Sequence, residues 1–151
     1  MAKKQAPDNN KLIVENRRAR YDYSIEDVLE CGIILMGSEV KALRIGSANI
    51  AESYVDIENG ELWLINSYVS LYTQAQNFGH EERRRRKLLV SKKQISKLWQ
   101  AKGRQAMTIV ALKIVSFLLF HLINYLTEGE RLHYIYLIVK QHILHPLNLV
   151  R

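Results

Sequence analysis

The sequence has few of the residues that catalytic and metal-binding sites require. It contains a single cysteine, Cys31, which excludes an internal disulfide and indicates a reducing compartment. It has neither a glycine-rich nucleotide loop nor a zinc-protease helix motif. Among the five histidines, His142 and His145 are three residues apart but have no third ligand in view. We therefore expect no enzyme activity, no cofactor and no metal ion, and we expect Cys31 to pack in the core.

Long apolar runs are also lacking. Residues 1–10 are polar and charged and contain Pro7, so they have no signal-peptide core and are interpreted as a disordered tail. The longest apolar stretch, Ile114–Leu126, has 13 residues, fewer than the roughly 18 that a membrane-spanning helix needs. We expect no membrane span. An alternative stays open in which the apolar C-terminus inserts into an anionic membrane surface.

Positive charge is what the chain has in excess. Its 22 Lys and Arg against 15 Asp and Glu give a net charge of +7, which favours an acidic partner such as nucleic acid. Three arginines lie within Asn16–Arg20, and Tyr21 and Tyr23 follow them. Guanidinium groups match phosphate and tyrosines stack on bases, although a solvated helix start with packing tyrosines is equally consistent. Five cations, Arg83–Lys87, lead directly into the apolar Leu88–Val90, so we expect their backbone to be held and their charges to be aimed, although a run of this kind is also typical of a solvated face.

The stretch Gly32–Arg44 is interpreted as a buried strand joined to a short basic helix. Ile33–Met36 is an unbroken apolar run, which is typical of a strand buried on both faces. Ser38 is a suitable N-cap, and Glu39 lies in the first turn, where the helix dipole favours an anion. The helix then has an apolar face and a basic face, formed respectively by Val40 with Leu43 and by Lys41 with Arg44.

The rest of the chain alternates short strands with helices. Asn59-Gly60 between two alternating segments predicts a β-hairpin over residues 54–65. The pattern also predicts a helix from Ser24 to Leu29 and strands over 69–73 and 108–114. A second helix is predicted from a Ser91 cap to Gly103, with Ile95, Leu98 and Trp99 on its apolar face. The predicted fold is mainly β with helices, a small antiparallel OB-like β-barrel with flanking short α-helices over residues 11–113.

Taken together, several motifs resemble those of the SsrA-binding protein (SmpB) family, over about residues 16–113. The resemblance is carried by Asn16-Arg-Arg-Ala-Arg-Tyr-Asp-Tyr23, Glu30-Cys-Gly-Ile33, Gly37-Ser-Glu-Val-Lys-Ala-Leu-Arg44, Ala48-Asn49, Asp56–Trp63 and Arg86-Lys-Leu-Leu89. It implies a bacterial, cytoplasmic, non-enzymatic protein with an oligonucleotide-binding barrel. Such a protein binds the tRNA-like domain of tmRNA (SsrA) and delivers it to stalled ribosomes for tagging and rescue, with no small-molecule substrate.

The resemblance also implies which residues contact RNA. By motif position, Asn16, Glu30 and Leu89 match tmRNA-contact residues of the family, and phosphate contacts would come from Arg18, Arg20, Lys41, Arg44 and Lys87. Lysine and arginine release counterions from phosphates, whereas Glu30 can accept hydrogen bonds from base or sugar donors. An internal ion pair with a nearby arginine is the alternative role for Glu30.

Residues 114–151 depart from the family pattern. The family continues there with a hairpin and a strongly basic tail that enters the mRNA channel of the ribosome, but this segment has three cations and two anions, net +1. We interpret it as an atypical apolar segment that replaces the last strands and the basic tail, and we hypothesise a shift of reading frame near Lys113–Val115. We expect the barrel to lose strand partners and the tail-dependent ribosomal step to fail.

Overall fold

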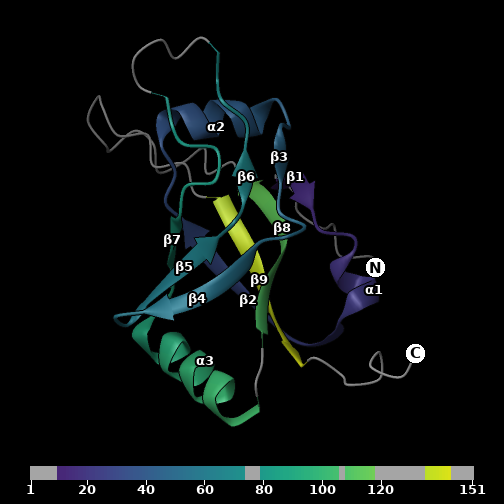
Figure 1. The fold of residues 1–151 in the computed structure, drawn as a ribbon, viewed down its shortest axis with the longest axis vertical. Coiled ribbons are helices and arrows are strands. Elements are labelled where there is room, and N and C mark those ends of the chain that lie inside the picture. The colour runs from purple at the N-terminus through teal and green to yellow at the C-terminus, as the bar shows by residue number, and fades with distance from the viewer. Residues whose placement is uncertain (1–9, 74–78, 106–107, 118–134, 144–151) are drawn as a thin grey trace, which may run out of the picture.

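The computed structural model describes residues 10–73, 79–105, 108–117 and 135–143 as a mainly antiparallel β structure with three helices (Figure 1). The strand order of the main sheet is β1-β8-β4-β5-β7-β2-β9, and β9 also pairs with β8, so the sheet curls round on itself. The main strands are β1 (Asn10–Glu15), β2 (Ser24–Ile33), β4 (Tyr54–Glu58), β5 (Glu61–Ile65), β7 (Arg86–Leu89), β8 (Thr108–Phe117) and β9 (Ile135–Ile143). The predicted OB-like antiparallel barrel with short helices is confirmed.

The smaller elements flank this barrel. A two-stranded sheet pairs β3 (Ala48–Asn49) with β6 (Tyr68–Val69), so the strand predicted over 69–73 is shorter and begins one residue earlier. The helices are α1 (Ala19–Asp22), α2 (Gly37–Arg44) and α3 (Lys92–Gln105). Figure 1 shows α2 and α3 at opposite ends of the barrel and α1 beside it.

The β4–β5 hairpin shows how local sequence determines this fold. Asn59 and Gly60 form its turn with φ angles of 51° and 72°, the left-handed pair that a two-residue hairpin loop requires. Inward side chains alternate along both strands and reach the core, where they are joined by residues of β2, α2, β7 and β8: Val55, Ile57, Leu62 and Leu64 from the hairpin, with Cys31, Leu43, Leu88 and Ile109. The predictions of the hairpin and of a packed Cys31 are confirmed.

The structure corrects two predictions around β2. Ser24–Leu29 is strand rather than helix, because it forms a ladder with β9 from Ser24↔Ile143 to Ile33↔Ile135, and this long-range pairing overrides the local capping signal. The strand also ends at Ile33 instead of continuing to Met36. Ile34 and Met36 are 43% and 39% exposed, because the chain leaves the sheet there to begin α2.

Helix α2 has the two faces that the sequence predicts. Val40 and Leu43 are buried against the barrel, whereas Lys41 and Arg44 are exposed. The N-cap is Met36 rather than Ser38, because the Glu39 carboxylate accepts a hydrogen bond from the Met36 N–H at 2.9 Å. A glutamate three residues into the helix thus satisfies the backbone N–H of the N-cap residue itself, whereas a capping Ser38 would accept from an N–H further into the helix.

Helix α3 begins as predicted but ends later. The Ser91 Oγ accepts from the Gln94 N–H, and the Gln94 side chain accepts from the Ser91 N–H, both at 3.3 Å. The helix passes through Gly103 and ends at Gln105, so the predicted end at Gly103 was wrong. Leu98 is buried, but Trp99 is 61% exposed, because its position turns it away from the face that Leu98 packs against the barrel.

Part of the atypical C-terminal segment belongs to the sheet. Strand β8 continues to Phe117, and β9 pairs along both β2 and β8, so the expectation that the barrel would lose strand partners was wrong. The sequence of β9, rich in β-branched residues, suits a strand paired on both edges. Residues 1–9, 74–78, 106–107, 118–134 and 144–151 lie outside the described part, which leaves out nearly all of the predicted N-terminal tail and most of the atypical C-terminal segment. No helix within the described ranges is long and apolar enough to cross a membrane.

Candidate nucleic-acid interface

Three of the residues matched to RNA contacts lie on one side of the barrel wall. Gly32 of β2 pairs with Leu89 of β7, and Glu30 lies two residues before Gly32 on the same side of its strand. Lys87 lies two residues before Leu89 and pairs with Trp63 of β5. We call these five residues the outer face. Strand register therefore brings Glu30 together with Lys87 and Leu89, which lie far from it in the sequence.

Gly32 allows the two strands of the outer face to pack closely. A Cβ atom at this position would lie 3.3 Å from the Cβ of Leu89, closer than side-chain atoms usually approach. The absent side chain leaves room for Leu89 to lie across β2 while remaining 44% exposed. The sequence identified Gly32 only as a strand boundary, and its packing role required the β2–β7 register.

The outer face mixes charge, aromatic surface and an unpaired carboxylate. The Lys87 Nζ lies 2.5 Å from the Glu61 Oε1, and the Arg85 guanidinium lies 5.2 Å from the centre of the Trp63 ring. Glu30 is exposed and forms no ion pair with any residue that the structure describes, so the alternative internal ion pair is not seen among them. Such a face offers a cation to phosphate, an apolar side chain to sugar or base, and an acceptor to hydroxyl or amino donors.

The other predicted cations form two further groups. Lys41 and Arg44 project from α2 at one end of the barrel, and the Lys41 Nζ lies 5.4 Å from the centre of the Tyr72 ring. Arg18 and Arg20 belong to the α1 segment, where each has an acidic neighbour. The Arg18 Nε lies 2.9 Å from an Asp22 carboxylate oxygen, and Arg20 lies 3.3 Å from the carboxylate of Glu15.

Asn16 differs from the other predicted contact residues because it is buried, with only 3% exposed. Its Nδ2 donates to the carbonyl oxygens of Ala111 at 3.2 Å and Ala51 at 3.5 Å. Its Oδ1 accepts from the Ala19 N–H at 3.1 Å. The side chain thus links β8, the turn after β3 and the start of α1, so it fixes the position of the segment that bears Arg18.

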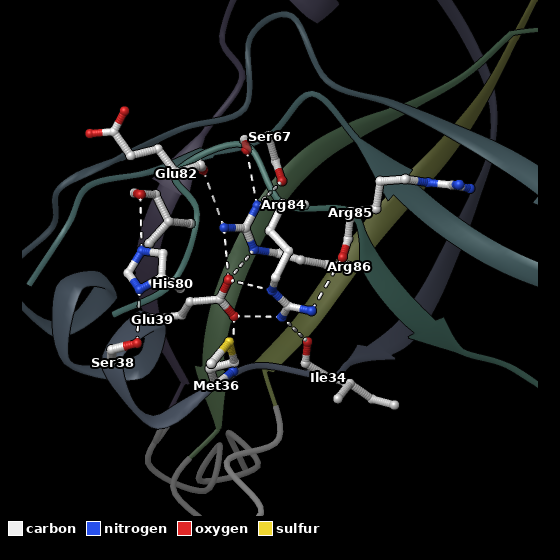
Figure 2. Close-up of polar contacts among 11 residues, drawn as sticks. Ile34, Met36, Ser38, Glu39, Ser67, His80, Glu82, Arg84, Arg85 and Arg86 are labelled. Carbon is white, nitrogen blue, oxygen red and sulfur yellow. Dashed lines mark hydrogen bonds and ion pairs between the residues drawn. The ribbon is translucent and has the colours of Figure 1, made fainter. Parts of the chain in front are cut away.

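A buried charge cluster, formed by Glu39, Arg84 and Arg86, attaches α2 to the strand that carries Lys87 and Leu89 (Figure 2). Arg84 donates to both Glu39 oxygens at 3.0 and 2.8 Å, and the Arg86 Nε donates to Oε1 at 3.0 Å. Glu39 is fully buried and Arg86 is 1% exposed. Burial alone raises the pKa of Glu39, but hydrogen bonds from Arg84 and the Met36 N–H, with the Arg86 charge, hold it below its ordinary value.

This cluster shows where part of the cationic run Arg83–Lys87 is directed. The backbone is held as expected, and Arg84 and Arg86 are directed into the protein, toward Glu39, rather than forming a solvated face. The Arg86 Nη1 donates to the Ser67 carbonyl oxygen at 3.0 Å and to its hydroxyl at 2.8 Å, and the Nη2 donates to the Glu82 carbonyl oxygen at 3.3 Å. Sequence reasoning missed the cluster because Glu39 and its two partners are 45 and 47 residues apart.

A buried histidine strengthens the same attachment. The His80 Nε2 lies 3.1 Å from the Val69 carbonyl oxygen, which can only accept, so Nε2 carries the proton. The His80 Nδ1 is hydrogen-bonded to the Ser38 hydroxyl, at 2.8 Å. Figure 2 shows this pair next to the Glu39 cluster, so the start of α2 is fixed by the His80–Ser38 hydrogen bond and by the ion pairs of Glu39 together.

No described group has the composition of an enzyme or metal site. The described residues contain no set of three or more metal-ligating side chains close together. Burial raises the pKa of the Cys31 thiol to about 12, so the thiolate that a nucleophilic cysteine requires does not form near neutral pH.

Comparison with known proteins agrees with this geometry. The family model described as "SmpB protein" matches residues 13–121. The chain is 66% identical over 112 residues to an SsrA-binding protein of Paracoccus denitrificans, covering 74% of this chain and 71% of that protein. It is 64% identical over 110 residues to an SsrA-binding protein of a Jannaschia species, covering 73% and 70%.

A solved structure has the same fold. It is described as "tmRNA-SmpB: a journey to the center of the bacterial ribosome" and superposes with a TM-score of 0.62 at 34% identity, covering 87% of this chain and 84% of that chain. The family match includes every residue of the outer face, both basic residues of α2 and the whole Glu39 cluster. On the extent of the family match and the identity to its curated relatives, this chain belongs to the SmpB family.

Proposed function

We propose that this protein is an RNA-binding adaptor of trans-translation, which binds the tRNA-like domain of tmRNA and delivers it to stalled ribosomes. The observation that supports this most directly is the outer face, where Glu30, Lys87 and Leu89 meet on the fold of a family whose curated relatives are SsrA-binding proteins. The proposed role requires binding and positioning but no chemical step, so we propose that the protein is not an enzyme. A role on stalled ribosomes supports a cytoplasmic location, which belongs to the same proposal.

Each predicted contact has a distinct physical role in this proposal. Lys87, Lys41 and Arg44 bind phosphates and release counterions. Leu89 packs on a sugar or base, and Glu30 accepts from a ribose hydroxyl or a base amino group, both of which RNA presents.

Arg18 and Arg20 bind phosphates by exchanging their acidic neighbours for RNA. Both side chains are largely exposed, and exposed ion pairs contribute only about 0–1 kcal/mol, so the exchange costs little. Asn16 acts indirectly. Its buried amide holds α1, and we expect its loss to weaken binding through displacement of Arg18 rather than through a lost RNA contact.

The C-terminal segment sets a limit on this function. The family match stops at residue 121, and residues 114–151 have a net charge of only +1. A tail that enters an RNA-walled channel needs an excess of cations. We therefore propose that the tail-dependent ribosomal step is impaired. We also propose that the reading frame shifts, and the family match supports a position nearer residue 121 than the expected Lys113–Val115. Resequencing of the gene with the intact mass of the protein tests the frame, and normal tagging of a stalled chain would contradict the impairment.

Leu89→Ala tests the outer face, with Leu12→Ala as its matched control, because Leu12 of β1 is a similarly exposed leucine at 51%. If RNA covers the exposed part of Leu89, the alanine variant loses roughly half of the free energy of burying a leucine side chain. Binding should then weaken about tenfold. Leu12→Ala should bind like the wild type. Affinity is measured on the full chain against the tRNA-like domain of tmRNA and an elongator tRNA. Equal effects of the two variants would contradict the proposed face, and no preference for tmRNA would contradict the proposed function.

A further inference from the structure

A polar cavity of about 310 Å³ lies beside α1 and includes no residue of the outer face. The turn after β3 forms one wall with Asn49, Ala51 and Glu52, and the segment around β6 forms another with Asn66 and Tyr68. Further lining comes from the α1 segment and from the loop before β7, through Arg18, Asp22, Tyr23 and Arg83.

The walls of this cavity are held in place by internal hydrogen bonds. Asn66 has a left-handed backbone with φ of 61°, and its side chain joins two walls. Its Nδ2 donates to the Glu52 carbonyl oxygen at 3.3 Å, and its Oδ1 accepts from Arg83 at 2.8 Å. The Asn49 Oδ1 accepts from the Ala51 N–H at 2.8 Å. A ligand would therefore meet a preorganised site and pay little for ordering it.

Several polar groups of the cavity are not used within the described protein. No described residue accepts from the Asn49 Nδ2, and none donates to the Glu52 carboxylate. Arg83 uses one terminal nitrogen on Asn66, and its guanidinium lies 5.7 Å from the centre of the Tyr68 ring. The cavity thus combines donors, acceptors and a stacked cation and aromatic ring.

The polar groups of this cavity fit a nucleobase of an RNA better than a phosphate. A phosphate only accepts hydrogen bonds, so it could use the Arg18 and Arg83 donors of the lining but would leave the Glu52 carboxylate without a donor. A nucleobase edge carries both donors and acceptors, and its face stacks on tyrosine or arginine. A cavity of about 310 Å³ is at the small end of ligand sites, and it has room for one base.

We propose that this cavity binds a single unstacked nucleobase of the RNA that the outer face recruits. The inference rests on the proposed function and adds to it a second recognition site on the α1 side. Since loops of folded RNA present unstacked bases, the base would come from a loop nucleotide of the tRNA-like domain.

Ala51→Trp fills the cavity without removing any of its polar groups, and Ala51→Ser is the matched control. Ala51 is exposed at the cavity wall and has no positive φ, so both replacements fit its backbone. Affinities of the full chain are measured against the intact tRNA-like domain and against a series that each carry one abasic loop nucleotide. Stacking of one base on an aromatic ring predicts a loss of about tenfold for Ala51→Trp with intact RNA and wild-type affinity for Ala51→Ser.

The abasic series separates a filled pocket from a general clash. One abasic position should cost the wild type about tenfold and cost Ala51→Trp nothing further. The base-binding proposal would be overturned if Ala51→Trp binds intact RNA as tightly as the wild type does. It would also be overturned if both proteins lose the same affinity at every abasic position. Failure of the wild type to bind intact RNA would instead overturn the proposed function. If Ala51→Trp does not fold, Asn66→Gly keeps the left-handed backbone and removes the Arg83 anchor, and the same abasic position should then lose its effect.

Discussion

Glu39→Gln tests the buried charge cluster that fixes α2 to β7. The substitution keeps the shape of the side chain and removes its charge, which leaves Arg86, 1% exposed, as a buried cation without its counter-ion. Breaking a buried ion pair by removing one partner costs about 3–5 kcal/mol. Small domains have total stabilities of about 5–15 kcal/mol, so this single change should remove a large share of the free energy of unfolding.

Urea unfolding at pH 7 measures the loss. At a slope of about 2 kcal/mol per molar urea, the midpoint should fall by roughly 2 M with an unchanged slope. Glu81→Gln is the control, because Glu81 is an exposed glutamate close to the same arginines in the chain, and it should change stability by less than about 0.5 kcal/mol. A loss of stability below about 1 kcal/mol for Glu39→Gln would contradict this expectation, because the buried arginine charge would then be stabilised by groups other than Glu39.

The same cluster predicts how stability depends on pH. The pKa of Glu39 is lowered from its ordinary value of 4.5, because the arginine hydrogen bonds and charges outweigh the effect of burial. A carboxyl group with a lower pKa when folded contributes stability above its unfolded pKa and loses it as pH falls through the folded value. Wild-type stability should therefore decline below about pH 4.5, and Glu39→Gln should decline less steeply. Parallel acid-unfolding curves, measured by circular dichroism, would show that Glu39 does not titrate in this way.

Three further predictions test the packing of the barrel. Gly32→Ala places a Cβ atom 3.3 Å from the Cβ of Leu89 and should displace the Leu89 side chain, which lowers tmRNA affinity and costs about 1 kcal/mol of stability. Unchanged affinity would show that Leu89 does not contribute to binding. Cys31, with its pKa raised to about 12, should resist iodoacetamide at pH 8 in the native protein and react fully in urea, as mass spectrometry would show; native labelling would contradict its burial. Gly60→Ala forces a side chain into a turn with φ of 72° and should cost about 1–2 kcal/mol in urea unfolding, whereas Asn59→Gly should be nearly neutral.

The elements that could be predicted from the sequence are those fixed by nearby residues. The Asn59-Gly60 turn and the two faces of α2 depend on neighbours within a few positions, and both are confirmed. Ser24–Leu29 was predicted as a helix because its local capping signal is genuine, but its ladder partner, β9, comes from the far end of the chain. Pairing between such distant segments cannot be recognised from a local pattern. The strand pairing therefore outweighs a capping signal that, from the sequence alone, indicates a helix start.

The candidate site was predictable in part for the same reason. Family resemblance selected Glu30 and Leu89, but only the pairing of Gly32 with Leu89 shows that they share a face. The inward arginines were unpredictable, because a run of five cations has the same appearance whether it is solvated or paired with a distant Glu39. The polar cavity beside α1 depends on four separate segments, none of which is distinctive by itself.

The proposal that this chain recognises RNA through its phosphates is tested by the salt dependence of binding to the tRNA-like domain of tmRNA. If Arg18, Arg20, Lys41, Arg44 and Lys87 each neutralise one phosphate, the slope of log affinity against log salt should be about −4.5, or a roughly 500-fold loss between 50 and 200 mM salt. The full wild-type chain should show this slope and prefer tmRNA to an elongator tRNA. Absence of binding, or an affinity that does not change over this range, would contradict the account.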